Sequence, residues 1–153
     1  MTRVALDSNI LIYAKVEPES DKGKSASTLI VRVAKDGVIP VQVTGEFLRF
    51  FQRRTPQLFD EAVLLLAIYK ATFHMPLTTG DVMTTAAELV QAHRLRLWDA
   101  VVCAASAAAG AKVLFSEDMQ DGRILNGLRI VNPFDAGNSD LIDALLGERG
   151  GST

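Results

Sequence analysis

Hydrophobic positions follow two patterns along the chain. Four short apolar runs have the length of strands that are buried on both faces. They are Val4–Leu6, Val38–Val41, Val113–Phe115 and Leu128–Val131. Longer segments with helical spacing of apolar residues lie between them, at about 24–35, 44–54, 58–73, 81–93 and 99–109. This alternation predicts an α/β fold, a three-layer α/β/α sandwich with a mostly parallel central sheet.

The ends of the helices and of the domain are marked by local signals. Thr44 and Thr79 have the side chains of helix N-caps, and Gly110 can close the helix before it. A chain of 153 residues favours one domain, which we expect to span residues 1–134. A cluster of turn formers then introduces residues 135–153, which we expect to form an extension with a short helix and a frayed end.

Composition excludes several classes of protein. With 48% hydrophobic and 22% charged residues, the chain does not resemble a disordered protein, and a formal net charge of −2 excludes a wholly basic, nucleic-acid-coating surface. The single cysteine, Cys103, excludes an intramolecular disulfide and suits a reducing compartment, where it is expected to be inert core. Because neither a signal peptide nor an apolar stretch of membrane-spanning length is present, we expect a cytoplasmic protein without membrane contact.

Two carboxylates directly follow predicted strands. Asp7 comes after Val4–Leu6, and Asp118 lies just past Val113–Phe115. In parallel sheets, ligands gather beyond the carboxyl ends of the strands, so both positions are candidates for chemistry. Each also has a structural alternative, since Asp7 can cap the next helix and Asp118 can serve turn geometry.

Two further carboxylates interrupt apolar helical sequence. Glu46 falls at the edge of an apolar stripe beside Phe50, with a surface pair to Arg49 as the alternative. Asp99 is the only charge in the segment 97–109, which otherwise reads as a fully buried helix, and the alternative for it is a helix cap. We place both acids in the first turn of helices that flank the strands.

Together, the four acids can face one crevice. Clustered carboxylates repel one another, so such a cluster is expected mainly where divalent cations bind. A set of ligands made only of oxygen suits Mg²⁺ or Mn²⁺. Metal ions held in this way support the hydrolysis of phosphodiesters.

Five segments resemble one family. They are LDSNILIY at 6–13, GEF at 45–47, WDA at 98–100, LFSEDMQDG at 114–122 and LRIVNPF at 128–134. In this order and spacing they resemble the PIN domains, and within them the VapC-type toxins of bacterial toxin–antitoxin pairs. The likeness spans residues 3 to about 134.

The resemblance implies a metal-dependent endoribonuclease that leaves a 5′-phosphate. It implies that Asp7, Glu46, Asp99 and Asp118 hold Mg²⁺ or Mn²⁺ and form the catalytic site. Ser8 and Asn9 would orient the first acid, and Asp121 is a candidate fifth acid. The implied partners are an RNA substrate, a cognate antitoxin and a second copy of the chain in a homodimer.

Two other functions stay open at this stage. A catalytically silent PIN-like module would keep the fold and bind RNA or a protein partner, although the intact set of four acids argues against it. A phosphatase with Asp7 as nucleophile is disfavoured, because the usual second aspartate two residues later is replaced by Asn9.

Several surface residues have two interpretations. The pairs Arg49 with Arg53 and Arg94 with Arg96 either hold an RNA backbone or are ordinary solvated charge. We expect Trp98 to pack in the core, with stacking on a base as the alternative. The apolar segment 63–73 is either deeply buried or an interface for a partner.

Overall fold

A four-stranded sheet lies at the centre of the molecule. The computed structural model describes residues 2–147 and orders the strands β1-β2-β4-β3. Strands β1 (Val4–Leu6), β2 (Val113–Phe115) and β4 (Leu128–Val131) are parallel, and β3 (Ile124–Leu125) is antiparallel to β4. The predicted α/β class with a mostly parallel sheet is confirmed.

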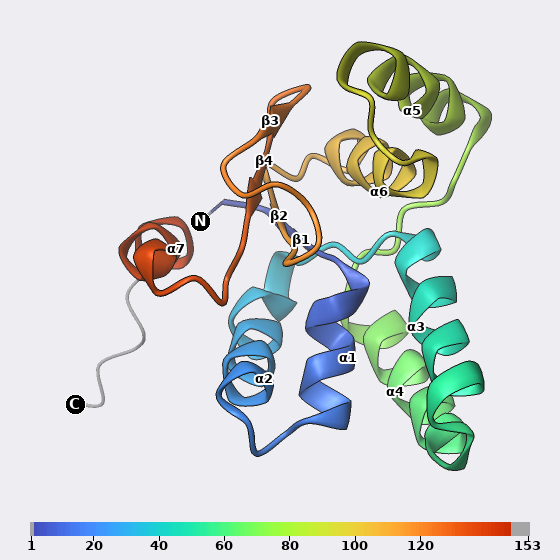
Figure 1. Ribbon diagram of the computed structural model, residues 1–153, viewed down its shortest axis with the longest axis vertical. Helices are drawn as coiled ribbons and strands as arrows, with labels where there is room; N and C mark the ends of the chain where they lie inside the picture. The colour runs from blue at the N-terminus through green and yellow to red at the C-terminus, as the bar shows by residue number, and fades with distance from the viewer. Residues whose placement is uncertain (1, 148–153) are drawn as a thin grey trace.

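Helices surround this sheet. They are α1 (Ser8–Val16), α2 (Asp21–Val33), α3 (Val41–Arg54), α4 (Phe59–Thr72), α5 (Gly80–His93), α6 (Leu97–Ala108) and α7 (Ser139–Leu146), with short 3-10 turns η1 (Ala34–Asp36), η2 (Pro56–Leu58) and η3 (Ala136–Asn138). Figure 1 shows α6, backed by α5, on one side of the sheet and α7 on the opposite side. Helix α1 packs on α2 and on α3, and α4 packs on α3.

The strand predicted at Val38–Val41 is wrong. Val38 forms only isolated bridges, to Ala5 on one side and to His74 on the other. Pro40 has no backbone N–H to donate to a ladder, and it serves as the N-cap of α3. Val38 therefore adds a single residue beside β1, at the edge of the sheet, before the chain enters α3.

Helix ends were predicted with mixed success. Thr79 caps α5 as expected, because its side chain accepts a hydrogen bond from the backbone N–H of Val82 at 3.2 Å. The predicted cap at Thr44 is wrong, since α3 begins at Val41 and the Thr44 hydroxyl donates back to the Val41 carbonyl oxygen at 2.7 Å. Gly110 follows the end of α6 with φ of 85°, which only glycine adopts readily, so it closes the helix as predicted.

An aromatic core joins α3 to α4. Phe47 packs against Phe51 with ring centroids 4.9 Å apart and against Tyr69 of α4 at 6.1 Å, both edge to face. Phe47 and Phe51 are completely buried. Because these rings occupy one side of α3, the side chains one position before each of them point toward the edge of the core, and this places Glu46 there.

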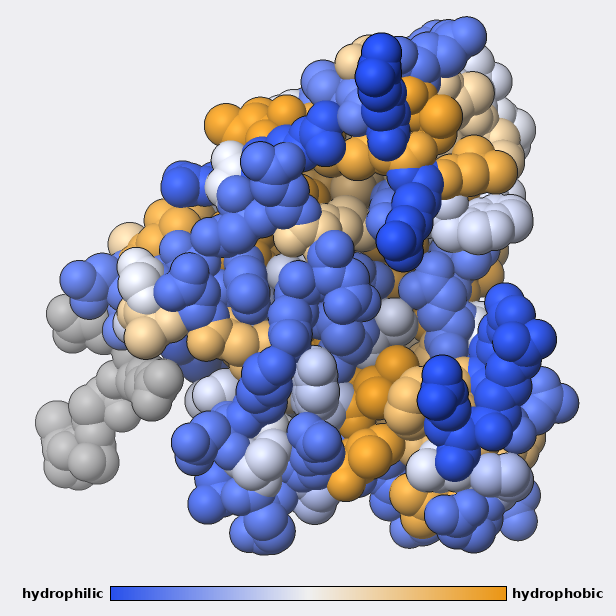
Figure 2. Space-filling model, in the orientation of Figure 1, coloured by the Kyte–Doolittle hydropathy of each residue, from blue (hydrophilic) through white to orange (hydrophobic). Residues whose placement is uncertain are grey.

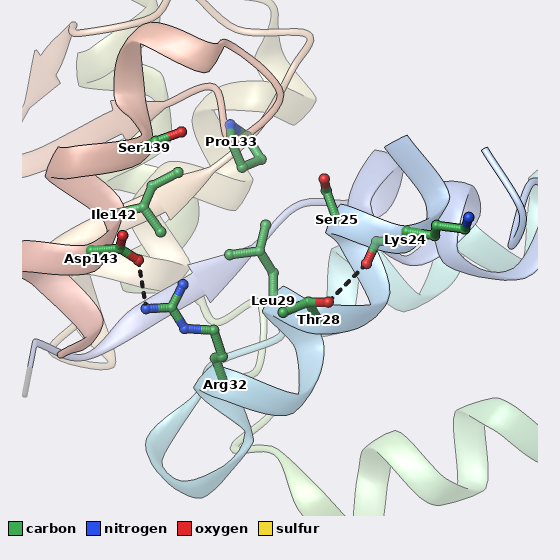
Figure 3. A pocket seen from close by; sticks show the side chains of 9 residues that line it. All are labelled: Lys24, Ser25, Thr28, Leu29, Arg32, Pro133, Ser139, Ile142 and Asp143. Carbon is green, nitrogen blue, oxygen red and sulfur yellow. Dashed lines mark hydrogen bonds and ion pairs between the residues drawn. The ribbon is translucent and has the colours of Figure 1, made fainter. Parts of the chain in front are cut away.

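The chain after β4 packs back on the domain. Figure 3 shows the contact between α2 and α7, where Arg32 donates to the Asp143 carboxylate at 3.1 Å across a cavity of ≈ 230 Å³. Arg32 also donates to the Gly147 carbonyl oxygen at 2.8 Å. The division of the chain at residue 134 stays a prediction, and the frayed end predicted for the last residues lies outside the described part.

Within residues 2–147, no helix is both long enough and apolar enough to span a membrane.

Candidate active site

The first carboxylate lies where two parallel strands end. The backbone N–H of Asp7 donates to the Phe115 carbonyl oxygen at 3.0 Å, so the side chains that follow β1 and β2 are neighbours. The Ser116 hydroxyl donates to Asp7 Oδ2 at 2.7 Å, and the Ser8 backbone N–H donates to Oδ1 at 2.8 Å. Asp7 is therefore the N-cap of α1, and its side chain is only 4% exposed.

Asn9 connects this site to the second strand. Its side-chain N–H₂ group donates to Asp118 Oδ2 at 3.2 Å and lies 3.5 Å from Asp7 Oδ2. Its side-chain oxygen accepts from the backbone N–H of Glu117 at 3.2 Å. Asn9 is buried, so one amide side chain fixes the distance between two carboxylates that are far apart in sequence.

Helix α3 contributes the third carboxylate. Ser8 donates its hydroxyl to Glu46 Oε2 at 3.1 Å, which joins α1 to α3 at the site. Glu46 is the sixth residue of α3, so its predicted place in the first turn is wrong, because the helix begins three residues earlier than Thr44. Residues 2–147 contain no ion pair between Glu46 and Arg49, so the surface-pair alternative is not supported.

Asp99 lies in the first turn of α6, as predicted. It makes no capping hydrogen bond there, because the cap position is Arg96 and no side chain caps the helix. Its carboxylate is half-buried. The positive charge of Arg96 lowers its pKa, and the negative charge of Asp118 raises it. The cap interpretation of Asp99 is therefore not supported, and the acid faces the other three.

The site raises the pKa of its own acids. Burial raises the pKa of Asp7 to about 6, against the opposing hydrogen bonds from Ser116 and Ser8, and the negative charges of Glu46 and Asp99 raise it further. Burial also raises the pKa of Glu46, and the charges of Asp99 and Asp118 add to the increase. For Asp99, burial is again the main cause, with Asp118 adding to it. The four carboxylates thus share one electrostatic environment.

A divalent cation fits this set of donors. The acids offer only oxygen ligands, and within the described residues the ion pairs involve other acids, at Asp36, Glu61, Glu117 and Asp143. Asp7 is buried beside other acids, and a bound cation would offset the cost of its charge. Among residues 2–147, however, no three acids converge at metal-binding distance. The four are neighbours whose side chains do not form a closed cage.

The candidate fifth acid has another role. Asp121 Oδ1 accepts from the backbone N–H of Asn132 at 2.9 Å, and the Asn138 side chain donates to both of its oxygens, at 3.1 and 3.2 Å. Both oxygens of Asp121 are therefore used to hold the segment after β4.

The expected inert role of Cys103 fits its surroundings, since burial raises the pKa of its thiol to about 12.

The beginning of α6 is exposed. Trp98 is 53% exposed and Leu97 is 43% exposed, so the predictions that Trp98 packs in the core and that this helix is buried throughout are wrong. The buried part of α6 begins only at Ala100. The indole therefore stands on the surface one residue before Asp99, close to the exposed Arg96.

An apolar groove leads away from the carboxylates. A cavity of ≈ 280 Å³ lies between α1 and α3. It is lined by Asn9, Ile12, Tyr13, Val16, Glu17, Phe50 and Asp118. Figure 2 shows apolar surface between α1 and α3, and strongly hydrophilic side chains over α3 and beside α5 and α6. Arg49 and Arg53 are exposed residues of α3, and the exposed Arg94 and Arg96 lie in the connection between α5 and α6.

Sequence reasoning missed some supporting side chains. Ser116 bonds to Asp7 across 109 residues, and the only sequence signal for it is a hydroxyl directly after a strand. Gln42, one helical turn before Glu46, is a second such residue, since its hydrogen bond opposes the rise in the pKa of Glu46. Its i, i+4 spacing could have identified it, had the start of α3 been placed correctly.

Comparison with known proteins gives a consistent result. The sequence profile of the PIN domain matches residues 4–121. No curated protein matches the chain at the level of sequence.

Solved structures with a similar fold include toxin–antitoxin proteins. A toxin–antitoxin complex from Klebsiella pneumoniae matches with a TM-score of 0.66 and 18% identity, covering 86% of this chain and 98% of that one. VapC20 of Mycobacterium tuberculosis, described as a Sarcin-Ricin loop cleaving toxin, matches at 0.63 and 18% identity, covering 75% and 89%. VapBC2 from Rickettsia felis, bound to a promoter DNA fragment, matches at 0.63 and 16% identity, covering 86% and 98%.

Proposed function

Because this chain belongs to the PIN-domain family, we propose that it is a metal-dependent endoribonuclease, the toxin of a type II toxin–antitoxin pair. The single observation that supports this most strongly is the arrangement of Asp7, Glu46, Asp99 and Asp118 around the hydrogen bonds of Ser8 and Asn9. The similar fold of a toxin described as cleaving the Sarcin-Ricin loop supports an RNA substrate.

In this proposal the four carboxylates bind Mg²⁺ or Mn²⁺. A divalent ion held by these carboxylates would stabilise negative charge on a phosphate and supply an activated water for attack on phosphorus. The bond from phosphorus to the 3′ oxygen breaks, which leaves a 5′-phosphate and a 3′-hydroxyl. Ser8, Asn9 and Ser116 orient the ligands, because each donates a hydrogen bond to at least one of the acids.

Residues around the carboxylates suit a single-stranded RNA. The exposed arginines of α3 and those before α6 can neutralise phosphates on both sides of the acids. The exposed indole of Trp98 offers a face for base stacking one residue from Asp99. The groove between α1 and α3 adds an apolar surface at the same place.

A second groove suits a protein partner. Between α1, α2 and α4 lies a cavity of ≈ 260 Å³, lined by Ala14, Lys15, Ser27, Ile30, Leu65 and Tyr69. Beside it, α4 exposes Val63, Leu64 and Ile68, so the deep burial considered for this segment is wrong. We assign this concave apolar surface to a segment of the antitoxin, and the complexes of similar fold support such a partner. Homodimerisation and a cytoplasmic location stay predictions.

The experiment is cleavage of a mixed RNA panel by the purified protein in Mn²⁺, Mg²⁺ or EDTA, with Asp99→Asn as the matched variant. Asp99 is half-buried and makes no capping bond, so the substitution should preserve folding, which thermal unfolding checks. We expect metal-dependent cuts with 5′-phosphate ends by the wild type, and a loss of at least 100-fold in Asp99→Asn.

Two results would contradict the proposal. Cleavage by Asp99→Asn at the wild-type rate would remove this acid from the catalytic site. Failure of the folded, partner-free wild type to cut any RNA, combined with tight RNA binding, would favour the silent binding module instead.

A further inference from the structure

A second cluster of side chains lies behind the carboxylates and has no part in the proposed chemistry. The Lys22 ammonium donates to Glu117 Oε1 at 2.6 Å, joining α2 to the loop after β2 across 95 residues of sequence. It lies 5.0 Å from the centre of the Tyr13 ring and 5.7 Å from that of Phe134. The two rings pack edge to face at 5.3 Å. Four segments of the chain thus meet at one cation.

The cluster is connected directly to a proposed metal ligand. Glu117 precedes Asp118, and its backbone N–H donates to Asn9 Oδ1 at 3.2 Å. The same Asn9 side chain donates to Asp118 Oδ2. Glu117 is therefore held at its backbone by Asn9 and at its carboxylate by Lys22, and Asp118 is the next residue along the chain.

The Glu117 carboxylate depends on Lys22 for its charge balance. Its side chain is 25% exposed, and its second oxygen, Oε2, is buried without a hydrogen-bond partner within the described residues. Without the ammonium the Glu117 carboxylate would lie half-buried without its cation, and such groups turn toward water. Because Glu117 directly precedes Asp118 and its backbone N–H is bonded to Asn9, that movement would disturb the peptide that positions Asp118.

We propose that Lys22, whose ammonium lies against the rings of Tyr13 and Phe134, is a positioning residue that fixes Asp118 for metal binding through its ion pair with Glu117. This inference rests on the proposed function, since it assigns a role in the same metal site. The expected magnitude follows from supporting groups in other metal sites, whose loss typically weakens metal affinity by about 10-fold to 100-fold. The partial exposure of Lys22 places this pair at the lower end.

The test measures Mn²⁺ binding by isothermal titration calorimetry on the full chain, with wild type, Lys22→Met, Lys22→Arg and Glu117→Gln. Methionine keeps the apolar stem that packs on the rings and removes the charge, whereas arginine keeps the charge. We expect the Kd for Mn²⁺ to rise about 10-fold in Lys22→Met and in Glu117→Gln, and to stay within about threefold of wild type in Lys22→Arg. At saturating Mn²⁺, kcat for RNA should recover to within about threefold of wild type.

Lys15→Met is the matched control. Lys15 pairs with Glu61 at 3.0 Å, so the variant also removes an ammonium from an ion pair, but this pair joins the far end of α1 to α4 and does not include the loop of Asp118. Its Kd for Mn²⁺ should not change. Thermal unfolding of every variant separates a general loss of stability from a change at the site, and Glu117→Gln serves as the test if Lys22→Met does not fold.

The outcomes separate this inference from the proposed function. Mn²⁺ binding by wild type that Asp118→Asn weakens, but that folded Lys22→Met and Glu117→Gln leave unchanged, would overturn the positioning role alone. Wild type that binds no Mn²⁺ would overturn both. An equal loss of affinity in Lys15→Met would show that the effect is general and would also overturn the positioning role.

Discussion

Asp7 combines two tasks that oppose each other in the metal-free protein. Its side chain caps α1 and accepts from Ser116, which favours the fold. Its charge is buried beside other acids, which raises its pKa to about 6 and disfavours the fold when the carboxylate is ionised. Asparagine at this position would remove the charge and keep one acceptor oxygen, for the Ser8 backbone N–H, while its NH₂ group could donate to the Ser116 hydroxyl.

The pH dependence of stability follows from this shift. In the folded state the pKa of Asp7 is raised above its ordinary value of 3.8, so the folded protein binds more protons than the unfolded chain between about pH 4 and pH 6. The stability that Asp7 contributes in its protonated form is fully present below pH 4 and is lost as the pH rises through 6. Its size is about 3 kcal/mol at most, because each pKa unit corresponds to about 1.4 kcal/mol.

We therefore predict that Asp7→Asn stabilises the metal-free protein at pH 8 by about 1–3 kcal/mol and gives no gain at pH 4. Urea unfolding of both proteins across this range in EDTA measures the difference, with the exposed Asp140→Asn as the control. Saturating Mn²⁺ should reverse the order at pH 8, since only the wild type keeps the full set of ligands. A difference that does not change with pH would show that ionised Asp7 costs the fold nothing.

Trp98 is predicted to contact the substrate. Stacking of one base on an aromatic ring contributes about 1–3 kcal/mol, so Trp98→Ala should raise KM for RNA by about 10-fold while kcat and Mn²⁺ affinity stay near those of wild type. Leu97→Ala is the matched control, because Leu97 is an exposed neighbour without an aromatic face. Steady-state kinetics on one RNA from the panel gives both constants, and equal KM values for wild type and Trp98→Ala would refute the stacking role.

At the scale of elements, the sequence predicted what depends on local pattern. The strands Val4–Leu6, Val113–Phe115 and Leu128–Val131 are confirmed to the residue. The first two are the continuous apolar runs that buried parallel strands form, and in the third only the exposed Arg129 interrupts buried apolar residues. Strand β3 was missed, since two residues are too short to form a pattern. The run at 38–41 has the same composition as a strand, but Pro40 ends it after a single bridge.

In the candidate site, too, the sequence predicted what depends on local pattern but not the contacts that only the fold creates. Asp7 and Asp118 could be placed because each follows a strand, and the position of Asp99 follows from its place at the start of a helix. The bonds that join them could not be predicted, since Ser116 meets Asp7 and Lys22 meets Glu117 only through the fold. For Trp98, the apolar sequence of α6 suggested burial. Helical periodicity could not show that the first turn of α6 has no neighbouring element packed over Leu97 and Trp98, which are exposed.

The segment between β4 and α7 supplies a prediction at this scale. Asp121 receives hydrogen bonds from Asn132 and Asn138, and these fix the turn that leads to α7. Asp121→Ala should lower the free energy of unfolding by about 0.5–1.5 kcal/mol, because it removes the acceptor of exposed hydrogen bonds whose donors can turn to water. It should not change the Kd for Mn²⁺. A tenfold weaker Kd with unchanged stability would identify Asp121 as a metal ligand instead.

Over the whole molecule, the two proposed activities occupy different faces. The carboxylates collect where β1 and β2 end, together with α3 and α6, whereas the apolar groove lies between α1, α2 and α4. Helix α1 borders both, since its first turn holds Ser8 and Asn9 and its last turn holds Ala14 and Lys15. A partner in the groove therefore contacts the far end of the helix that orients the acids.

The partner groove gives the last prediction. Leu64 is 67% exposed on α4 next to Leu65, which lines the groove, whereas Leu77, in the loop before α5, is equally exposed but lies outside the helices that form the groove. Each protein is co-expressed with the product of the reading frame next to its gene, and the complex is measured by co-purification and then by Kd. Leu64→Glu should weaken binding by at least 10-fold, because the buried carboxylate would lose water without gaining a partner, whereas Leu77→Glu should bind like wild type.

RNA cleavage by the free proteins should be equal, since neither position touches the carboxylates. Equal binding by wild type and Leu64→Glu would place the antitoxin elsewhere, and no binding by wild type would refute this partner.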